Sequence, residues 1–299
     1  MKLRACKPPA IARDIAPTPP AIQQDLPLAD PIPLVAPLAP ASITKLWFCV
    51  WLPHLPMESV GGDNAGAPTA TVEEQHGIHR ILLVDAAARA AGVRPKQAAN
   101  AALALLPTLH LEERSLLREQ QALEGLATWL ERFSSFVSIA DQDVLLLEIA
   151  GSLRLFGGLR ELRQKISRGL RSLGFTGALA IAPTPLAATW LARAGRRACI
   201  RDETNLAPAL RKLPLACMDW PASLCETLAG MGVMTIGDCL RLPREGFTRR
   251  FGAEFLLHLV RALGHLPDPR NSWRAPVLFC ADYEMTEEQT DRELLLNFC

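Results

Sequence analysis

Three short apolar runs, each bounded by turn-forming or polar residues, most constrain what this chain can fold into. They are L-W-F-C-V-W at 46–51, V-L-L-L-E-I at 144–149 and A-L-A-I-A at 178–182. Apolar runs of four to eight residues are typical of buried strands, and segments with helical spacing separate them here. We therefore predict an α/β fold, in the broader α+β sense, in which helices cover a sheet.

Helical periodicity fills the segments between and after these runs. Apolar residues recur every three or four positions in residues 113–133 and 157–173, which predicts two amphipathic helices. Their apolar positions are Leu116, Leu123, Leu126, Leu130 and Phe133 in the first helix, and Leu159, Leu162, Ile166, Leu170 and Leu173 in the second. From about residue 204 the pattern is wholly helical, in short units broken at Pro214, Pro221, Gly232 and Pro243. A small helical domain should therefore follow the α/β region.

The first 45 residues form a separate region, because ten of the 24 prolines of the chain lie there. Proline fixes φ and has no backbone N–H, so a proline-dense segment cannot build a helix or a strand ladder. We predict that residues 1–45 are a disordered tail and that the folded region begins at Leu46.

The bulk composition excludes several classes of protein. The 32 Lys and Arg residues balance 31 Asp and Glu, giving a net charge of +1, so nucleic-acid binding would have to depend on local clusters. The eight cysteines form no C-x-x-C pair, which argues against a zinc site and favours reduced thiols in the cytoplasm. No apolar run is long enough to span a membrane, and the start of the chain has no apolar signal segment.

Six motifs in order resemble the Y-family (translesion) DNA polymerases, and above all their catalytically degenerate bacterial branch, the ImuB proteins. The motifs are L-W-F-C-V-W-L-P-H-L-P-M-E at 46–58, A-A-A-R-A-A-G-V-R-P at 86–95, L-L-L-E-I-A-G-S-L-R-L-F-G-G at 145–158, A-I-A-P-T-P-L-A-A at 180–188, W-P-A-S-L followed by L-A-G-M-G-V-M-T-I-G-D within 220–238, and L-P-R-E-G-F-T-R-R-F-G at 242–252. Each motif is weak by itself, but their common order between residues 46 and 252 is specific.

The resemblance implies a right-hand polymerase core, with a ferredoxin-like palm, small fingers and an all-helical thumb. The palm would span 46–203 with the fingers inserted at about 52–100, and the thumb would span 204–274 with helix-hairpin-helix-like turns. Residues 275–299 would form a truncated linker that leads toward a missing little-finger domain. Six acids against one arginine within 281–299 fit a linker.

The metal ligands of active relatives are mostly absent from this sequence. In those enzymes an acid from the first palm strand and an adjacent Asp-Glu pair hold two Mg²⁺ ions. The first acid falls here on Cys49, and the pair falls on Asp143 and Val144, so two of three carboxylates are lost. A further position, acidic in many active members, is Trp51. The resemblance therefore implies a pseudo-enzyme that needs no cofactor, with Asp143 as a residual metal position that holds no ion.

The contacts to a nucleotide triphosphate are also reduced. Arg89 matches an arginine of the fingers, but the tyrosine three residues before it is replaced by Ala86. A palm loop that carries lysines in the family reads A-P-T-P here, with Pro183 and Pro185 in the lysine positions. Arg89 is accordingly either a surviving nucleotide contact or a relic that forms an ion pair on the surface.

Binding of DNA does not require the metal ions, because arginines and backbone N–H groups can hold phosphates. Four arginines follow the M-G-V-M-T-I-G-D turn and are candidate contacts to a primer-template duplex: Arg241, Arg244, Arg249 and Arg250. A second basic cluster precedes the predicted thumb: Arg193, Arg196, Arg197 and Arg201. The alternative interpretation of both clusters is a solvated basic surface.

Three functions remain open at this point. The first is a non-catalytic DNA-binding component of error-prone DNA repair in the bacterial cytoplasm, beside ImuA, an error-prone replicative-type polymerase and the sliding clamp. The family's clamp-binding tail has no counterpart in this chain. The second is a weak nucleotidyltransferase in which Asp143 and a relocated acid such as Asp141 hold Mg²⁺. The third is an interaction module that has lost DNA binding. Primer extension and salt-dependent DNA binding separate these alternatives.

Overall fold

The computed structural model describes residues 45–61, 66–196 and 198–275, so the predicted tail and most of the predicted linker lie outside the described residues. Its main sheet has four antiparallel strands in the order β5-β6-β1-β7. They are β1 (Trp47–Trp51), β5 (Val137–Asp141), β6 (Val144–Glu148) and β7 (Ala178–Ala182). The three strands predicted from apolar runs are confirmed. The unpredicted strand, β5, lies at the sheet edge, where burial is incomplete and the apolar pattern is weaker.

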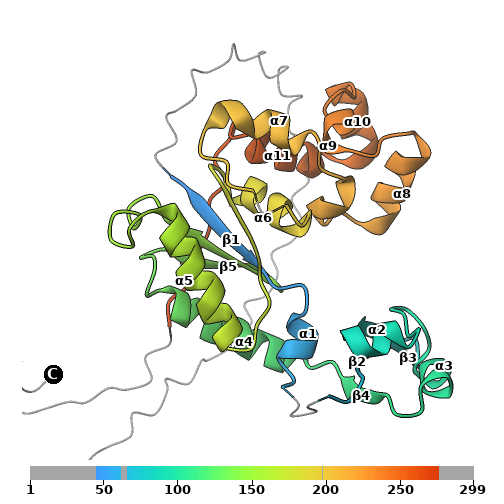
Figure 1. The fold of residues 1–299 in the computed structure, drawn as a ribbon. Helices are drawn as coiled ribbons and strands as arrows, with labels where there is room; N and C mark the ends of the chain where they lie inside the picture. Colours follow the sequence, from blue (N-terminus) through green and yellow to red (C-terminus); the bar gives the residue numbers. More distant parts are fainter. Residues whose placement is uncertain (1–44, 62–65, 197, 276–299) are drawn as a thin grey trace, which may run out of the picture. The chain divides into compact units, whose positions relative to one another are not determined.

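Helices cover both faces of this sheet (Figure 1). Phe48 and Val50 of β1 pack on one face with apolar residues of α4 (Leu116–Leu130) and α5 (Leu159–Ser172). Trp47 and Cys49 point to the opposite face, where α6 (Pro185–Arg193) packs. Side chains alternate between faces along a strand, so β1 contributes to both cores. The order β1-α4-β5-β6-α5-β7 is the ferredoxin-like arrangement.

The two predicted amphipathic helices are confirmed as α4 and α5, with one difference at an end of each. Leu123, Leu126 and Leu130 of α4 are buried, whereas Leu116 is 61% exposed in the first turn. In α5 the buried positions are Leu162, Ile166 and Leu170, and Leu173 is 47% exposed just after the helix. Both outliers extend the apolar spacing beyond the length of helix that the sheet covers, so the spacing overestimated the buried face.

A second, three-stranded sheet is inserted between β1 and α4, in the order β3-β2-β4. Its strands are β2 (Thr69–Gln75), β3 (Ile78–Val84) and β4 (His110–Glu113), and the helices around them are α1 (Leu55–Glu58), α2 (Ala86–Ala90) and α3 (Ala99–Leu105). The predicted end of this insertion near residue 100 falls inside α3 and is too early. Because β4 pairs in parallel with β2, the small sheet continues to Glu113.

The region after residue 203 is helical, as the sequence predicts. Its elements are η1 (Glu203–Asn205), α7 (Leu206–Leu210), η2 (Leu215–Met218), α8 (Ala222–Gly230), α9 (Ile236–Cys239), α10 (Arg244–Phe251) and α11 (Ala253–Ala262). Pro214, Pro221 and Pro243 each stand at the N-cap of a helical element, and Gly232 adopts a positive φ of 79° in the turn after α8. Among the described residues, no helix combines the length and apolar character needed to cross a bilayer.

Candidate functional site

Cys49 and Val144, which the family resemblance places at two metal positions of active relatives, are parts of the core. Both side chains are 0% exposed and belong to the cluster on the α6 face of the sheet. Burial raises the pKa of the Cys49 thiol to about 12, although a hydrogen bond with Thr189 and the charge of Arg193 oppose the shift. A neutral thiol and an aliphatic side chain offer Mg²⁺ no hard oxygen ligand. These two positions are therefore closed to metal chemistry.

Asp143, the retained acid of the motif, uses both carboxylate oxygens within the protein. It lies in the turn between β5 and β6. Its Oδ2 accepts a hydrogen bond of 2.7 Å from Trp51 Nε1, and its Oδ1 accepts one of 3.0 Å from Arg193 Nη2. Trp51, at a position that the resemblance gives as acidic in many active relatives, therefore donates a hydrogen bond to Asp143 instead of supplying a carboxylate.

The guanidinium of Arg193 joins three carboxylates. Its Nη2 also donates to Asp141 Oδ2 at 2.9 Å, and its Nη1 lies 3.1 Å from Asp219 Oδ2. The arginine side chain is only 12% exposed, and it is the last residue of α6. Burial alone would lower the pKa of Arg193, but the hydrogen bonds and charges of Asp143, Asp141 and Asp219 raise it above its ordinary value.

Arg193 was predicted to share a basic surface with Arg196, Arg197 and Arg201, and for Arg193 this is wrong. Arg196 and Arg201 are exposed, whereas the Arg193 guanidinium turns into the carboxylate cluster. Arg197 lies outside the described residues. Nothing in the local sequence connects Arg193 with Asp143, which are 50 positions apart. The available signal was that Arg193 is the one charged residue of the otherwise apolar helix α6.

The two Mg²⁺ ions that active relatives hold do not fit these residues. Within the part of the chain that the structure describes, no group of three His, Cys, Asp or Glu side chains is arranged to hold a metal ion. Glu148, the remaining acid on β6, accepts hydrogen bonds from the N–H groups of Leu46 and Ala150 at the far end of that strand. A cation is nevertheless present between Asp141 and Asp143, and it is the guanidinium of Arg193.

The A-P-T-P loop at 182–185 leads into α6 and is bound within the protein. The side chain of Thr184 caps the helix by accepting from Ala187 N, and its hydroxyl donates to the carbonyl of Ala262 in α11 at 2.8 Å. Leu186 N, in the first turn of α6, donates to Asp268 Oδ2 at 3.2 Å. Since a carboxylate of the chain already lies at this helix N-terminus, a phosphate would meet a like charge there.

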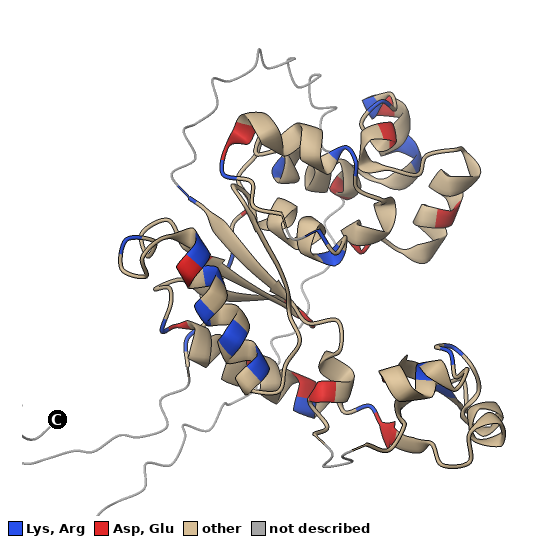
Figure 2. Cartoon of the chain, viewed as in Figure 1, with Lys and Arg blue, Asp and Glu red and all other residues tan. Residues whose placement is uncertain are grey.

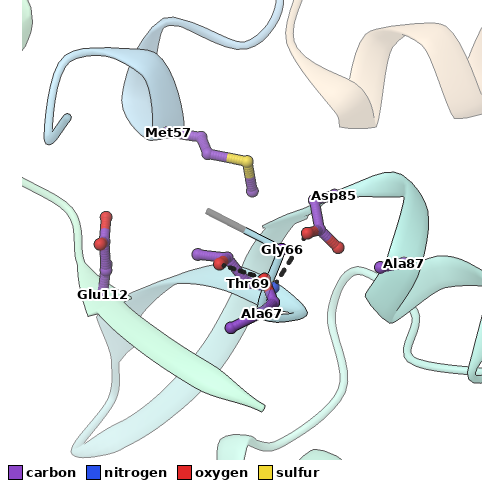
Figure 3. Close-up of a pocket in the computed structure, with 7 residues that line it drawn as sticks. All are labelled: Met57, Gly66, Ala67, Thr69, Asp85, Ala87 and Glu112. Atoms are coloured by element: carbon purple, nitrogen blue, oxygen red, sulfur yellow. Dashed lines mark hydrogen bonds between the residues drawn. The ribbon is translucent and has the colours of Figure 1, made fainter. Parts of the chain in front are cut away.

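Two small cavities lie in the described part of the chain, one of them beside Asp143, and neither is suited to a triphosphate. One, of about 280 Å³, is lined by residues of the small sheet and α1 and carries the acids Asp85 and Glu112 without Lys or Arg (Figure 3). Asp85 also caps α2 and accepts from Thr69 N. The other, of about 180 Å³, borders Asp143, and its cation Arg114 is bound by Glu73 and Glu119. Cavities this small, whose linings are acidic or have their positive charge neutralised, are poor sites for an anionic nucleotide.

Arg89, the candidate nucleotide contact, lies on the exposed side of α2. Its guanidinium donates to the carbonyl of Val84 at 3.3 Å, and the residue lines neither cavity. The prediction of a relic with a surface ion pair is therefore corrected in one respect, because the Arg89 guanidinium binds a backbone carbonyl rather than a carboxylate. This contact helps to fix the start of α2 and does not direct the side chain to Asp143.

The four candidate DNA contacts are exposed but do not share one face. Arg241 pairs with Asp238 at 3.1 Å and is 82% exposed. Arg244, Arg249 and Arg250 belong to α10, and at 3.6 residues per turn they point roughly 100–140° apart around its axis. The Arg250 guanidinium lies over the Phe251 ring, and its Nη1 is 3.5 Å from the sulfur of Met231. Among the described residues, neither Arg244 nor Arg249 has an ion pair, a side-chain hydrogen bond or a ring contact of this kind.

Comparison with known proteins places the sequence beside one group of relatives. Residues 63–193 match the impB/mucB/samB family. The Protein ImuB sequences of two Caulobacter vibrioides strains, NA1000 / CB15N and ATCC 19089 / CIP 103742 / CB 15, are each 35% identical to this chain over 173 residues. The aligned region is 58% of this chain and 38% of each relative, so this chain corresponds to part of the length of those proteins.

Solved structures of Y-family enzymes share the fold. DinB from Sulfolobus solfataricus superimposes with a TM-score of 0.59 and 16% identity, covering 76% of this chain and 69% of that one. An insertion ternary complex of Dbh DNA polymerase gives a TM-score of 0.61 and 16% identity, covering 75% and 69%. The mixed α/β core with its helical region is therefore the Y-family polymerase fold. Together these matches show that part of the chain is similar in sequence to ImuB proteins and that the chain has the fold of the Y-family DNA polymerases.

Proposed function

We propose that the chain is a non-catalytic, polymerase-shaped DNA-binding component of error-prone DNA repair. The observation that supports the loss of catalysis is the bonding of Asp141 and Asp143 to Arg193, next to the metal positions lost at Cys49 and Val144. Two-metal phosphoryl transfer needs carboxylates that clamp two cations about 4 Å apart. A carboxylate pair that is bonded to a guanidinium, beside a thiol and a valine, lacks those ligands.

Support for DNA binding comes from the fold and from surface charge. Dbh DNA polymerase, which shares the fold, has been solved in insertion and post-insertion complexes. Arginines of the helical region lie in solvent, where they can neutralise phosphates without loss of core contacts. ImuA, an error-prone polymerase and the sliding clamp remain predictions of the family resemblance.

The alternative of a weak nucleotidyltransferase keeps one supporting observation. Asp141, Asp143 and Asp219 converge within 3.1 Å of one guanidinium, so three carboxylates against one arginine leave a formal charge of −2 in the cluster. That residual charge would attract a divalent cation. The primer-extension arm of the experiment below therefore includes Mn²⁺ as well as Mg²⁺.

The proposed function is tested by binding and primer extension on the same primer-template duplex. We expect that this chain does not extend the primer with either metal ion. Dbh DNA polymerase, assayed in parallel, serves as the active control. We expect duplex binding whose affinity falls with salt, and Arg249→Glu with Arg250→Glu should weaken it on unrelated sequences alike and flatten the salt slope by about two counterions.

The matched control reverses Arg160 and Arg168 of α5, which packs on the sheet face opposite to that of the helical region. Figure 2 shows the row of basic residues along this helix. Both double variants change the net charge equally, so an equal loss of affinity would indicate bulk charge rather than a site on α10. Primer extension that Asp143→Ala abolishes would refute the non-catalytic proposal. Absence of duplex binding at low salt would leave the interaction module as the correct function.

A further inference from the structure

We propose that Arg193 is a built-in cation that has taken the place of the metal in this fold. In this proposal Asp141, Asp143 and Asp219 bind Arg193 and thereby hold α6 and the helical region to the sheet. The inference deepens the proposed function, since it gives the retained acids a structural role. It is testable without DNA or nucleotide.

The geometry of the guanidinium matches this role. Arg193 Nη2 donates to Asp141 and Asp143 on the sheet side, at 2.9 and 3.0 Å, whereas Nη1 reaches Asp219 at 3.1 Å. Asp219 follows η2 in the helical region and adopts a left-handed backbone with φ of 56°, which aspartate tolerates better than most residues. One planar side chain therefore connects strands β5 and β6 to the start of the helical region.

Burial separates this arrangement from an ordinary surface ion pair. The Arg193 side chain is 12% exposed, whereas the three carboxylates are 33%, 43% and 66% exposed. The positive charge is therefore enclosed, with one oxygen of each carboxylate directed at it, as ligand oxygens are directed at a bound metal ion. Because a guanidinium is always protonated and its donors are fixed in a plane, it can hold several carboxylates permanently.

The surroundings also exclude a return of the metal. Trp51 Nε1 donates to the second oxygen of Asp143, so both oxygens of that carboxylate already accept a hydrogen bond from the protein. Cys49 and Val144 beneath the cluster are fully buried and apolar in character. A divalent ion would have to displace Arg193 and leave its charge in a poorly solvated position, which is costly.

The test measures thermal unfolding of the whole chain in EDTA and in Mn²⁺. We expect the wild-type midpoint to be the same in both conditions. Arg193→Ala should lower the midpoint in EDTA by about 5–10 °C, because it leaves three carboxylates without their shared cation. Mn²⁺ should then restore part of the loss, since carboxylate oxygens without the guanidinium between them can rearrange around an ion. The midpoint of Arg193→Lys in EDTA should lie between those of the wild type and Arg193→Ala, because an ammonium keeps the charge but lacks the planar set of donors.

Two controls keep the result specific. Arg196→Ala removes an exposed arginine three positions away and should leave the midpoint unchanged. Adding Asp143→Asn to Arg193→Ala should abolish the effect of Mn²⁺. Should Arg193→Ala fail to fold, Mn²⁺ binding to the wild-type chain, followed by electron paramagnetic resonance, decides the question, and we expect none at the cluster.

Three outcomes would overturn the inference. They are a wild-type midpoint that rises with Mn²⁺ and loses that rise in Asp143→Asn, an Arg193→Ala variant as stable as the wild type, and a destabilised Arg193→Ala variant that Mn²⁺ does not restore. None of these depends on DNA binding. A negative primer-extension result would therefore still support the proposed function if this inference failed.

Discussion

Single residues decide the chemistry of the cluster, because ligand type is fixed by side-chain identity. Cys49 and Val144 remove two ligands wherever they lie in space, whereas Asp143 keeps a carboxylate whose use depends on its neighbours. In this structure those neighbours are Trp51 and Arg193, which donate to its two oxygens. A retained acid is thus not a retained metal site.

At this scale the pH dependence of Asp141 provides a test of its pairing. Burial alone would raise the pKa of Asp141, but the N–H of Gln142 and the Arg193 guanidinium outweigh it and hold the pKa below the ordinary 3.8. A carboxylate with a lowered folded-state pKa stabilises the protein above its unfolded-state pKa. That stabilisation is lost as the pH falls through the folded-state value.

We therefore expect Asp141→Asn to unfold at a lower temperature than the wild type at neutral pH. The difference between the two midpoints should shrink as the pH falls below about 4. Thermal unfolding across this range measures it, with Glu226→Gln as the control at an exposed acid outside the cluster. A difference that stays constant, or grows, in acid would contradict the pairing of Asp141 with Arg193.

Helices α4 and α5 pack closely against each other on the sheet face opposite α6. A methyl group built on Gly169 of α5 would lie 2.2 Å from the Trp129 ring of α4. Gly125, in the middle of α4, has open space at the same position. The two glycines therefore predict opposite effects of the same substitution.

Gly169→Ala should lower the free energy of unfolding by about 1–3 kcal/mol, because the indole ring must move out of a packed position. Gly125→Ala should raise it by about 0.5–1 kcal/mol, since alanine loses less backbone entropy in a helix. Denaturant unfolding of both variants measures the two changes. If Gly169→Ala were as stable as Gly125→Ala, the described crossing of α4 and α5 would be wrong.

In the whole folded region, residues 264–274 connect the last helix back to the sheet. Asp268 accepts from Leu186 N and pairs with Arg270 at 2.7 Å. Trp273 N donates to the carbonyl of Val137 at 2.6 Å, and its indole N–H reaches the hydroxyl of Thr128 at 3.3 Å. Since β5 is the edge strand of the sheet, this segment also covers part of an open edge.

We predict that a chain lacking residues 264–299 unfolds several degrees below one that lacks only 275–299. Trp273→Ala in the full chain should reproduce part of that difference. A chain that starts at Leu46 should unfold like the full chain, because a proline-dense tail is expected to contribute few contacts. Equal midpoints for the two C-terminal deletions would show that residues 264–274 do not stabilise the sheet.

Most of the main sheet and its helices followed from the sequence alone. Buried strands such as β6 and amphipathic helices such as α5 carry their own pattern, because burial on a sheet or a helix face imposes a fixed spacing of apolar residues. That Cys49 and Val144 offer no carboxylate was equally readable, since it depends only on residue identity. Their correspondence to metal positions stays a prediction of the family resemblance.

The tertiary structure alone decided what the remaining acids do. Asp143 and Arg193 lie 50 positions apart, and Asp219 binds the same guanidinium from the helical region. No local spacing of residues could therefore have predicted this contact. The short edge strand β4 was missed for a related reason, because its pairing with the distant strand β2, rather than its own apolar content, fixes it. Strand β5 pairs with β6, the next strand in the sequence, and was missed because its burial at the sheet edge is incomplete. A local pattern records which face of an element is buried. Only the folded chain brings the end of α6 to the β5–β6 turn, where one guanidinium can bind three carboxylates.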